Sequence, residues 1–120
     1  MTAVARSNLF AAGLLGFTGI VLGAFGAHAL KSQLLERGMT QAWQTAVLYH
    51  LVHAVAFLAL PNWVWVHRLW LAGIFLFCGS LYWLALGGPR FLGPITPLGG
   101  VSFLAGWALV AWKAYQLPKE

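Results

Sequence analysis

The sequence predicts an all-α integral membrane protein. Four transmembrane helices form a compact bundle, with a short interfacial helix between the first and second. Three observations predict this fold class. Of the 120 residues, 61% are hydrophobic and 8% are charged, whereas a soluble domain is about 45–50% apolar and about 25% charged. The apolar residues form four runs, each near the roughly 20 residues that a helix needs to cross a bilayer. Tryptophans and basic residues stand at the ends of these runs, as they do at membrane interfaces.

The four apolar runs cover residues 9–29, 42–60, 66–86 and 95–114. Only helices and closed barrels satisfy every backbone polar group in lipid, and continuous apolar runs lack the alternation of a barrel strand. A chain of this length accommodates one domain. We therefore expect residues 1–120 to form a single membrane domain of four helices.

The link between the first two runs has an amphipathic pattern. In the stretch KSQLLERGMTQ, Leu34 and Leu35 share a side with Leu30, whereas the residues between and after them are polar: Lys31, Gln33, Glu36 and Arg37. This pattern predicts a short interfacial helix that ends at Gly38. Thr40 is expected to cap the helix that follows.

The other two links differ in length and composition. PNWVWVHR is so short that the helices on either side must be antiparallel neighbours. Trp63, Trp65 and Trp70 are predicted to form an aromatic belt there, with His67 in water or head groups. GGPRFLGPITPLGG contains three prolines and five glycines, and we expect a rigid, turned loop.

The formal net charge is +5, and its distribution argues against nucleic acid as a partner. Nucleic-acid binding needs a basic stripe or patch, whereas the basic residues here stand singly beside apolar runs. We interpret them as anchors to lipid head groups, which makes membrane lipids expected partners. Four basic residues lie on the side of the membrane that holds both termini, and three lie on the other side. Because basic residues are enriched on the cytoplasmic side, this count favours cytoplasmic termini. The seven are Arg6, Lys31, Arg37, Arg68, Arg90, Lys113 and Lys119.

The first run carries a stripe of glycines. Gly16, Gly19, Gly23 and Gly26 are spaced by three, four and three residues, which places them on one face of a helix. In lipid, helices associate through close backbone contact, and small residues permit it. We expect the stripe to pack against another helix of this chain, with a homodimer interface as the alternative. A helix that continued straight to His28 would turn that residue away from the stripe.

Ionisable groups inside a membrane are functional candidates. His50 and His53 lie on one face of the second run, and His28 ends the first run on the same side of the membrane. With Tyr49, and with Lys31 at the rim, they form a candidate polar site. Neutral, hydrogen-bonded structural histidines are the favoured interpretation. Metal or haem ligation, and handling of protons or a polar ligand, are the alternatives.

No catalytic set is visible: the sequence has no acid–base carboxylate pair, supported nucleophile or phosphate loop. It contains no aspartate, and Glu36 and Glu120 lie outside the apolar runs. We therefore expect no catalytic residue, no metal site and no cofactor. Thr18, Ser80 and Ser102 are predicted to form hydrogen bonds between helices.

Several motifs carry a family resemblance. They are GAFGAHALK (23–31), YHLVHAVA (49–56) and GPITPLGGVSFLAGW (93–107), the last preceded by CGSLY (78–82). Together they resemble the YgdD-like family of small bacterial inner-membrane proteins, which has a mitochondrial membrane relative. The likeness spans nearly the whole chain in the same order.

The resemblance implies a four-helix protein of the cell inner membrane. The family is classed as of unknown function, so it implies no reaction, cofactor or catalytic residue. Its pattern often has glutamine at position 50, which favours a hydrogen-bonding role over a two-histidine metal site. The positions that match its motifs are Gly26, His28, Lys31, Tyr49, His53, Thr96, Pro97 and Gly99.

Two functions follow as hypotheses. The abundant small-residue surface and the missing catalytic set favour a non-enzymatic membrane component that packs with itself or with another membrane protein. The alternative is a membrane protein that handles a ligand, a proton, a metal or haem at the polar site.

Overall fold

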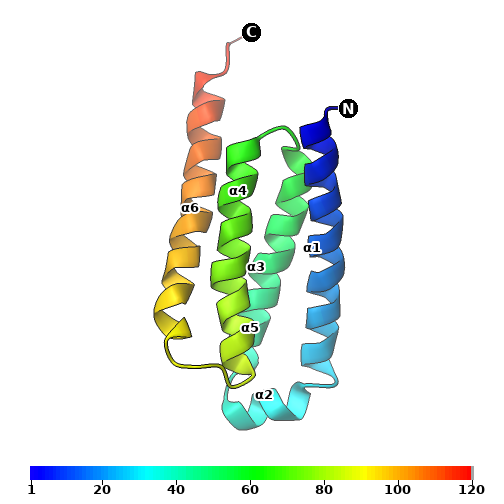
Figure 1. The fold of residues 1–120 in the computed structure, drawn as a ribbon, viewed down its shortest axis with the longest axis vertical. Helices are drawn as coiled ribbons and strands as arrows, with labels where there is room; N and C mark the ends of the chain where they lie inside the picture. Colours follow the sequence, from blue (N-terminus) through cyan, green and yellow to red (C-terminus); the bar gives the residue numbers. More distant parts are fainter. Residues whose placement is uncertain (120) are drawn as a thin grey trace.

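The computed structural model describes residues 1–119, and Glu120 lies outside this range. Every regular element in the described range is helical, and four segments are long and apolar enough to cross a membrane. This confirms the all-α membrane fold class. The elements are α1 (Ala3–Ala27), α2 (Lys31–Arg37), α3 (Thr40–Ala59), α4 (Val64–Gly73), the π-helix η1 (Ile74–Gly79), α5 (Ser80–Ala85) and α6 (Leu92–Gln116) (Figure 1).

The helices run up and down, so that both chain ends and the α3–α4 link lie at one end of the molecule (Figure 1). Helix α2 and the α5–α6 link lie at the other end. Helix α1 packs mainly along α3, while α6 packs along α4, η1 and α5. Only 11% of the most apolar stretch of α1 is buried, against 39% in the α4–η1–α5 span. Helix α1 is therefore an edge helix.

Helix α1 begins earlier than the predicted residue 9. Thr2 caps it, and its Oγ1 accepts a hydrogen bond of 3.0 Å from the backbone N–H of Ala5. The polar stretch from Arg6 to Asn8 precedes the apolar run but belongs to the helix, because polar side chains can point away while the backbone hydrogen bonds of the helix continue. The helix ends at Ala27, and His28 is its C-cap.

Helix α6 begins at Leu92, not at the predicted residue 95, and includes much of the stretch predicted to be a turned loop. Pro94 and Pro97 both lie within it. Pro94 lies in the first turn, where backbone N–H groups lack a partner within the helix and proline is tolerated, whereas Pro97 lies farther inside α6 and removes one backbone hydrogen bond. The turned segment is limited to the residues before α6, where Gly87 has a φ of 94°.

The interfacial helix α2 ends, as expected, at Gly38, whose left-handed φ of 66° suits glycine. Leu34 is buried, but Leu35 is 62% exposed, so the two side chains do not share a face. Thr40 is the first residue of α3 and does not cap it: Met39 is the N-cap and makes no side-chain hydrogen bond. The prediction for Thr40 is therefore wrong.

The third span, formed by α4, η1 and α5, contains the π-helix η1, which the sequence pattern does not predict. Gly99 of α6 packs directly on it: a Cβ at this position would lie 2.7 Å from the carbonyl carbon of Leu76 and 2.7 Å from the Cα of Phe77. Because these neighbours are backbone atoms, only glycine allows this approach of the two helices. This contact fixes α6 against the third span.

The aromatic belt is smaller than predicted. Trp65 is 62% exposed, and the guanidinium carbon of Arg68 lies 4.8 Å from its ring centre. Lys113 lies similarly over Trp63, at 5.1 Å. Trp70, by contrast, is fully buried in the core of the bundle. It lies well inside α4, on the face that packs against the neighbouring helices, so its assignment to the belt is wrong.

Candidate functional site

Three of the four glycines of the stripe lie against α3. A Cβ at Gly19 would lie 2.6 Å from Leu51 Cδ2, one at Gly23 would lie 3.3 Å from Val47 Cγ1, and one at Gly26 would meet the indole of Trp43. The fourth glycine, Gly16, has no atom within 4 Å of such a Cβ. The packing face within this chain therefore begins at Gly19.

The indole of Trp43 explains the close approach at the end of α1. It is 2% exposed, and its Nε1–H donates a hydrogen bond of 2.8 Å to the carbonyl of Leu22. This bond holds the ring against Gly26 and joins α3 to α1. Trp43 is not among the residues predicted above to be functional, although a tryptophan in the first turn of an apolar run is a signal for such a bond.

His50 joins three helices. Its Nδ1 lies 2.9 Å from the hydroxyl of Tyr82, and its Nε2 lies 3.2 Å from Thr18 Oγ1. The Thr18 hydroxyl donates to the carbonyl of Leu14 at 2.9 Å, so its oxygen is free to accept from His50 Nε2–H. The Tyr82 hydroxyl then donates to His50 Nδ1. This assignment uses both ring nitrogens of a neutral histidine.

His53 points to the other side of the bundle. Its Nδ1–H donates to the carbonyl of Tyr49 at 2.7 Å, and its Nε2 accepts from the Trp107 indole N–H at 3.0 Å. Its ring stacks on Phe103, with 3.9 Å between ring centres. Both nitrogens are again used by a neutral ring. His53 therefore joins α3 to α6, whereas His50 joins α3 to α1 and α5.

The five residues of the candidate polar site do not form one site, and only Tyr49 and His53 are in direct contact. His28 and Lys31 are exposed beside α2, and neither makes a side-chain hydrogen bond to the other three. Tyr49 is 40% exposed, and its ring packs against Phe77, with 4.8 Å between ring centres. His50 and His53 face different helices. The structure thus contains two separate histidine centres.

Three predicted bonds between helices are confirmed. Thr18 bonds to His50 as described above, and the hydroxyls of Ser80 and Thr96 lie 2.5 Å apart and join α5 to α6. Ser102 donates to the carbonyl of Leu69 at 2.6 Å and joins α6 to α4. Within residues 1–119, no group of three or more His, Cys, Asp or Glu side chains could hold a metal ion.

His67 differs from the prediction that placed it in water or head groups. It is 3% exposed, and neither of its ring nitrogens makes a hydrogen bond of good geometry in the described part of the chain, although the backbone of Leu60 lies close enough to interact with the ring. Its ring lies 4.1 Å from that of Phe57. Because α4 already begins at Val64, His67 lies within the helix and faces the interior. A buried imidazole without a partner is costly and requires an explanation.

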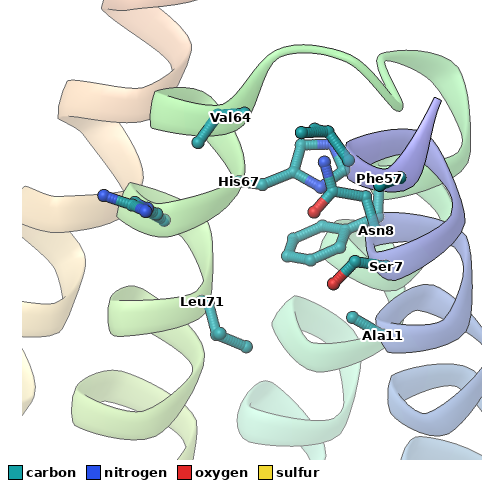
Figure 2. Close-up of a pocket in the computed structure, with 10 residues that line it drawn as sticks. Ser7, Asn8, Ala11, Phe57, Val64, His67 and Leu71 are labelled. Atoms are coloured by element: carbon teal, nitrogen blue, oxygen red, sulfur yellow. The ribbon is translucent and has the colours of Figure 1, made fainter.

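A groove lies between α1 and the third span, and His67 lines its end. The first cavity of the groove, of about 400 Å³, is lined by Ser7, Asn8, His67 and Arg68, among others. Figure 2 shows the His67 side chain directed from α4 toward Asn8 of α1. A second cavity of about 440 Å³ follows farther along the helices.

The two cavities adjoin each other, because Ala11 and Leu71 line both of them. The second cavity extends between α1 and η1, past Leu15, Ile74 and Phe75. Each volume is within the range of about 300–1,000 Å³ that is usual for ligand sites. The groove has a polar end and a long apolar part.

These features define a class: a helical membrane protein with four membrane-length helices, joined by buried histidines and with a groove along its edge helix. A family described as "Protein of unknown function (DUF423)" matches residues 22–100. The chain belongs to this family.

Named relatives cover most of the chain. It is 40% identical over 125 residues to the UPF0382 inner membrane protein YgdD of Escherichia coli (strain K12), covering 96% of this chain and 94% of the relative. It is 43% identical over 99 residues to the UPF0382 membrane protein YwdK of Bacillus subtilis (strain 168), covering 74% and 80%. No solved structure matches.

The comparisons confirm the resemblance to the YgdD-like family. They also confirm the predicted location: the relatives are named inner membrane or membrane proteins, and this chain has four membrane-length apolar helices. It is a multi-pass protein of the inner membrane. The family has no assigned activity.

Proposed function

We propose that this protein is a non-enzymatic membrane component that binds a lipid molecule in the groove between α1 and the third span. The observation that carries this proposal is His67, a buried side chain without a hydrogen-bond partner at the polar end of an otherwise apolar groove. A lipid has the matching shape, with a polar head and a hydrocarbon chain.

The apolar part of the groove suits a hydrocarbon chain. His50, Thr18 and Tyr82 line it, but their polar atoms bond to one another and to the backbone. The groove therefore presents carbon atoms over most of its length. A ligand with a polar group at this depth would find no free partner in these three side chains.

The arrangement of α1 favours access from the bilayer. The Thr2 hydroxyl donates to Asn62 Oδ1 at 2.9 Å, and the Asn8 amide donates to the carbonyl of Pro61 at 2.6 Å. These bonds attach the start of α1 to the α3–α4 link at the end of the groove. A ligand therefore enters sideways, between α1 and the third span, where no long helix–helix contact closes the groove.

The non-enzymatic character is supported by the use of the buried polar groups. His50 and His53 each have both ring nitrogens in hydrogen bonds that join helices. Proton transfer by either ring would require one of these bonds to break. Their role in this proposal is to hold the bundle in shape.

Lipid retention tests the proposal. Full-length protein is extracted in mild detergent, and co-purified lipid is measured by native mass spectrometry. Ala11→Phe fills the junction of the two cavities, while Ala24→Phe makes the same change at an exposed position of α1. We expect the first variant to lose bound lipid and the second to retain it. Equal retention by both folded variants contradicts the proposal.

Association with a second copy or with another membrane protein is a second candidate function. It is favoured by the edge position of α1, where Gly13 and Gly16 leave open space between the exposed rings of Phe10 and Phe17. Such a surface suits close helix packing. Crosslinking in native membranes tests it: a Gly13→Leu variant should lose a crosslinked product that the unaltered chain forms, and a chain that forms no such product contradicts it.

A further inference from the structure

Resting on the proposed lipid groove, we infer that its occupant is an anionic phospholipid, whose phosphate is bound between Arg68 and His67 at the polar end. Nothing in the family description assigns a ligand. The inference has three supports: the charge at this end of the groove, the unsatisfied donors that line it, and its depth in the membrane.

The charge at the polar end is positive. Arg68 lines the first cavity, and Arg6 lines a neighbouring surface hollow that shares Ala3 and Ser7 with it. Within residues 1–119 the sole carboxylate side chain is that of Glu36, in α2 at the opposite end of the molecule (Figure 1). These cations therefore have no acidic side chain nearby, and an anion would balance them.

The polar end of the groove also contains hydrogen-bond donors that are not used within the chain. A neutral His67 ring carries one N–H, and neither nitrogen has a partner in the described chain. Asn8 uses one amide N–H on Pro61 and keeps a second. Ser7 adds a hydroxyl that lies beside Asn8 across from His67 (Figure 2). Phosphate oxygens accept such bonds, and arginine binds phosphate with two parallel donors.

The depth of this end fits a phospholipid head group. The exposed Trp65 under Arg68 and the Lys113–Trp63 pair mark the membrane interface at the same end of the bundle. Lipid phosphates lie at that level, and the second cavity extends from there toward the centre of the bilayer. The groove thus places the head and chain of one lipid at the depths they already occupy.

The test compares two lipids with the same acyl chains. Delipidated full-length protein in mild detergent is titrated with phosphatidylglycerol or phosphatidylcholine and analysed by native mass spectrometry, with soluble glycerol phosphate as a third probe. Both lipids carry the phosphate, but the choline cation of phosphatidylcholine is repelled by Arg68 and Arg6, so we expect about tenfold tighter binding of phosphatidylglycerol. Glycerol phosphate alone should bind too weakly to detect.

Two variants locate the preference. Arg68→Gln, at an exposed side chain, should bring the two lipids to nearly equal binding, and it should weaken phosphatidylglycerol more than phosphatidylcholine because only the former has a net negative charge. The matched control Arg90→Gln removes a charge at the opposite end and should keep the preference. His67→Phe should also reduce it. If His67→Phe does not fold, the comparison of Arg68→Gln with Arg90→Gln still tests where the phosphate binds.

The outcomes separate this inference from the proposed function. Equal binding of the two lipids, with both reduced by Ala11→Phe, overturns the anionic preference and leaves the groove intact. Lipid binding that Ala11→Phe does not affect overturns both. If Arg90→Gln abolishes the preference for phosphatidylglycerol and Arg68→Gln does not, the lipid phosphate binds at the other end of the molecule. That result overturns the assignment of the phosphate site to Arg68 and His67. Binding of glycerol phosphate as tight as that of the lipid overturns a lipid as the source of the phosphate.

Discussion

Replacing Gly99 by alanine is predicted to destabilise the bundle strongly. The new Cβ would lie 2.7 Å from two backbone atoms of η1, at Leu76 and Phe77. Backbone atoms of a packed helix cannot move aside alone, so α6 must shift away from the third span. Overpacking of this kind costs about 1–3 kcal/mol, and the rigid neighbours place Gly99→Ala at about 3 kcal/mol.

The adjacent glycine supplies the control. A Cβ at Gly100 would lie 3.8 Å from Phe77 Cδ2, which is ordinary contact. Both glycines lie in α6, so the gain in helix propensity of about 1 kcal/mol applies to both variants and cancels between them. Gly99→Ala should therefore be about 3 kcal/mol less stable than Gly100→Ala.

The assay is the free energy of unfolding from a titration with SDS in mixed micelles, followed by tryptophan fluorescence. If the two variants differ by less than about 0.5 kcal/mol, the scatter of ordinary surface substitutions, the close approach of α6 and η1 is refuted. A variant of Gly99 that does not fold at all supports it.

The remaining predictions concern the contacts of α1 and α3. Gly19→Leu should prevent folding, because its side chain would enter α3, while Gly16→Leu should fold, as judged by gel filtration in detergent. His50→Gln should keep the bonds to both neighbouring helices and stability within about 0.5 kcal/mol, whereas His50→Leu should lose about 1–3 kcal/mol in the SDS titration by leaving a tyrosine hydroxyl unpaired. A double-mutant cycle of His53→Phe and Trp107→Phe should give a coupling of about 1 kcal/mol from their hydrogen bond.

Each of these predictions has a clear contrary result. Equal folding of the two glycine variants would mean that the stripe does not pack on α3. Equal loss by glutamine and leucine at position 50 would mean that the ring is needed for its shape and not for its hydrogen bonds. A coupling of zero between positions 53 and 107 would mean that the indole N–H finds another acceptor.

The spans could be predicted from the sequence, because hydropathy reports directly on the solvent around a segment. Their ends could not. Arg6 and Asn8 are polar, and Pro94 and Pro97 lack a backbone N–H, yet all four lie inside helices. Helix formation depends on the backbone, and a proline in the first turn, such as Pro94, costs little, while the packing of α6 must offset the hydrogen bond that Pro97 removes. A prediction from hydropathy alone therefore makes α1 and α6 too short.

The burial of individual residues was harder to predict for a physical reason. In a membrane, lipid and protein interior are equally apolar, so no contrast along the sequence shows which face of a helix is buried. The sequence pattern predicts Trp70 and His67 at the interface, yet both are buried. The partners of His50 and His53 depend on how each helix is rotated, and two side chains three residues apart proved to face different neighbours.

The most direct test of the lipid groove is the distance between the lipid phosphate and the His67 ring. Solid-state NMR measures dipolar coupling between lipid ³¹P and ¹⁵N-labelled histidine side chains, with the protein in phosphatidylglycerol membranes and His67→Phe used for assignment. We predict a coupling that corresponds to hydrogen-bond range and disappears in the variant. Histidine signals without ³¹P coupling, or a coupling that persists in His67→Phe, would contradict a phosphate at this end of the groove.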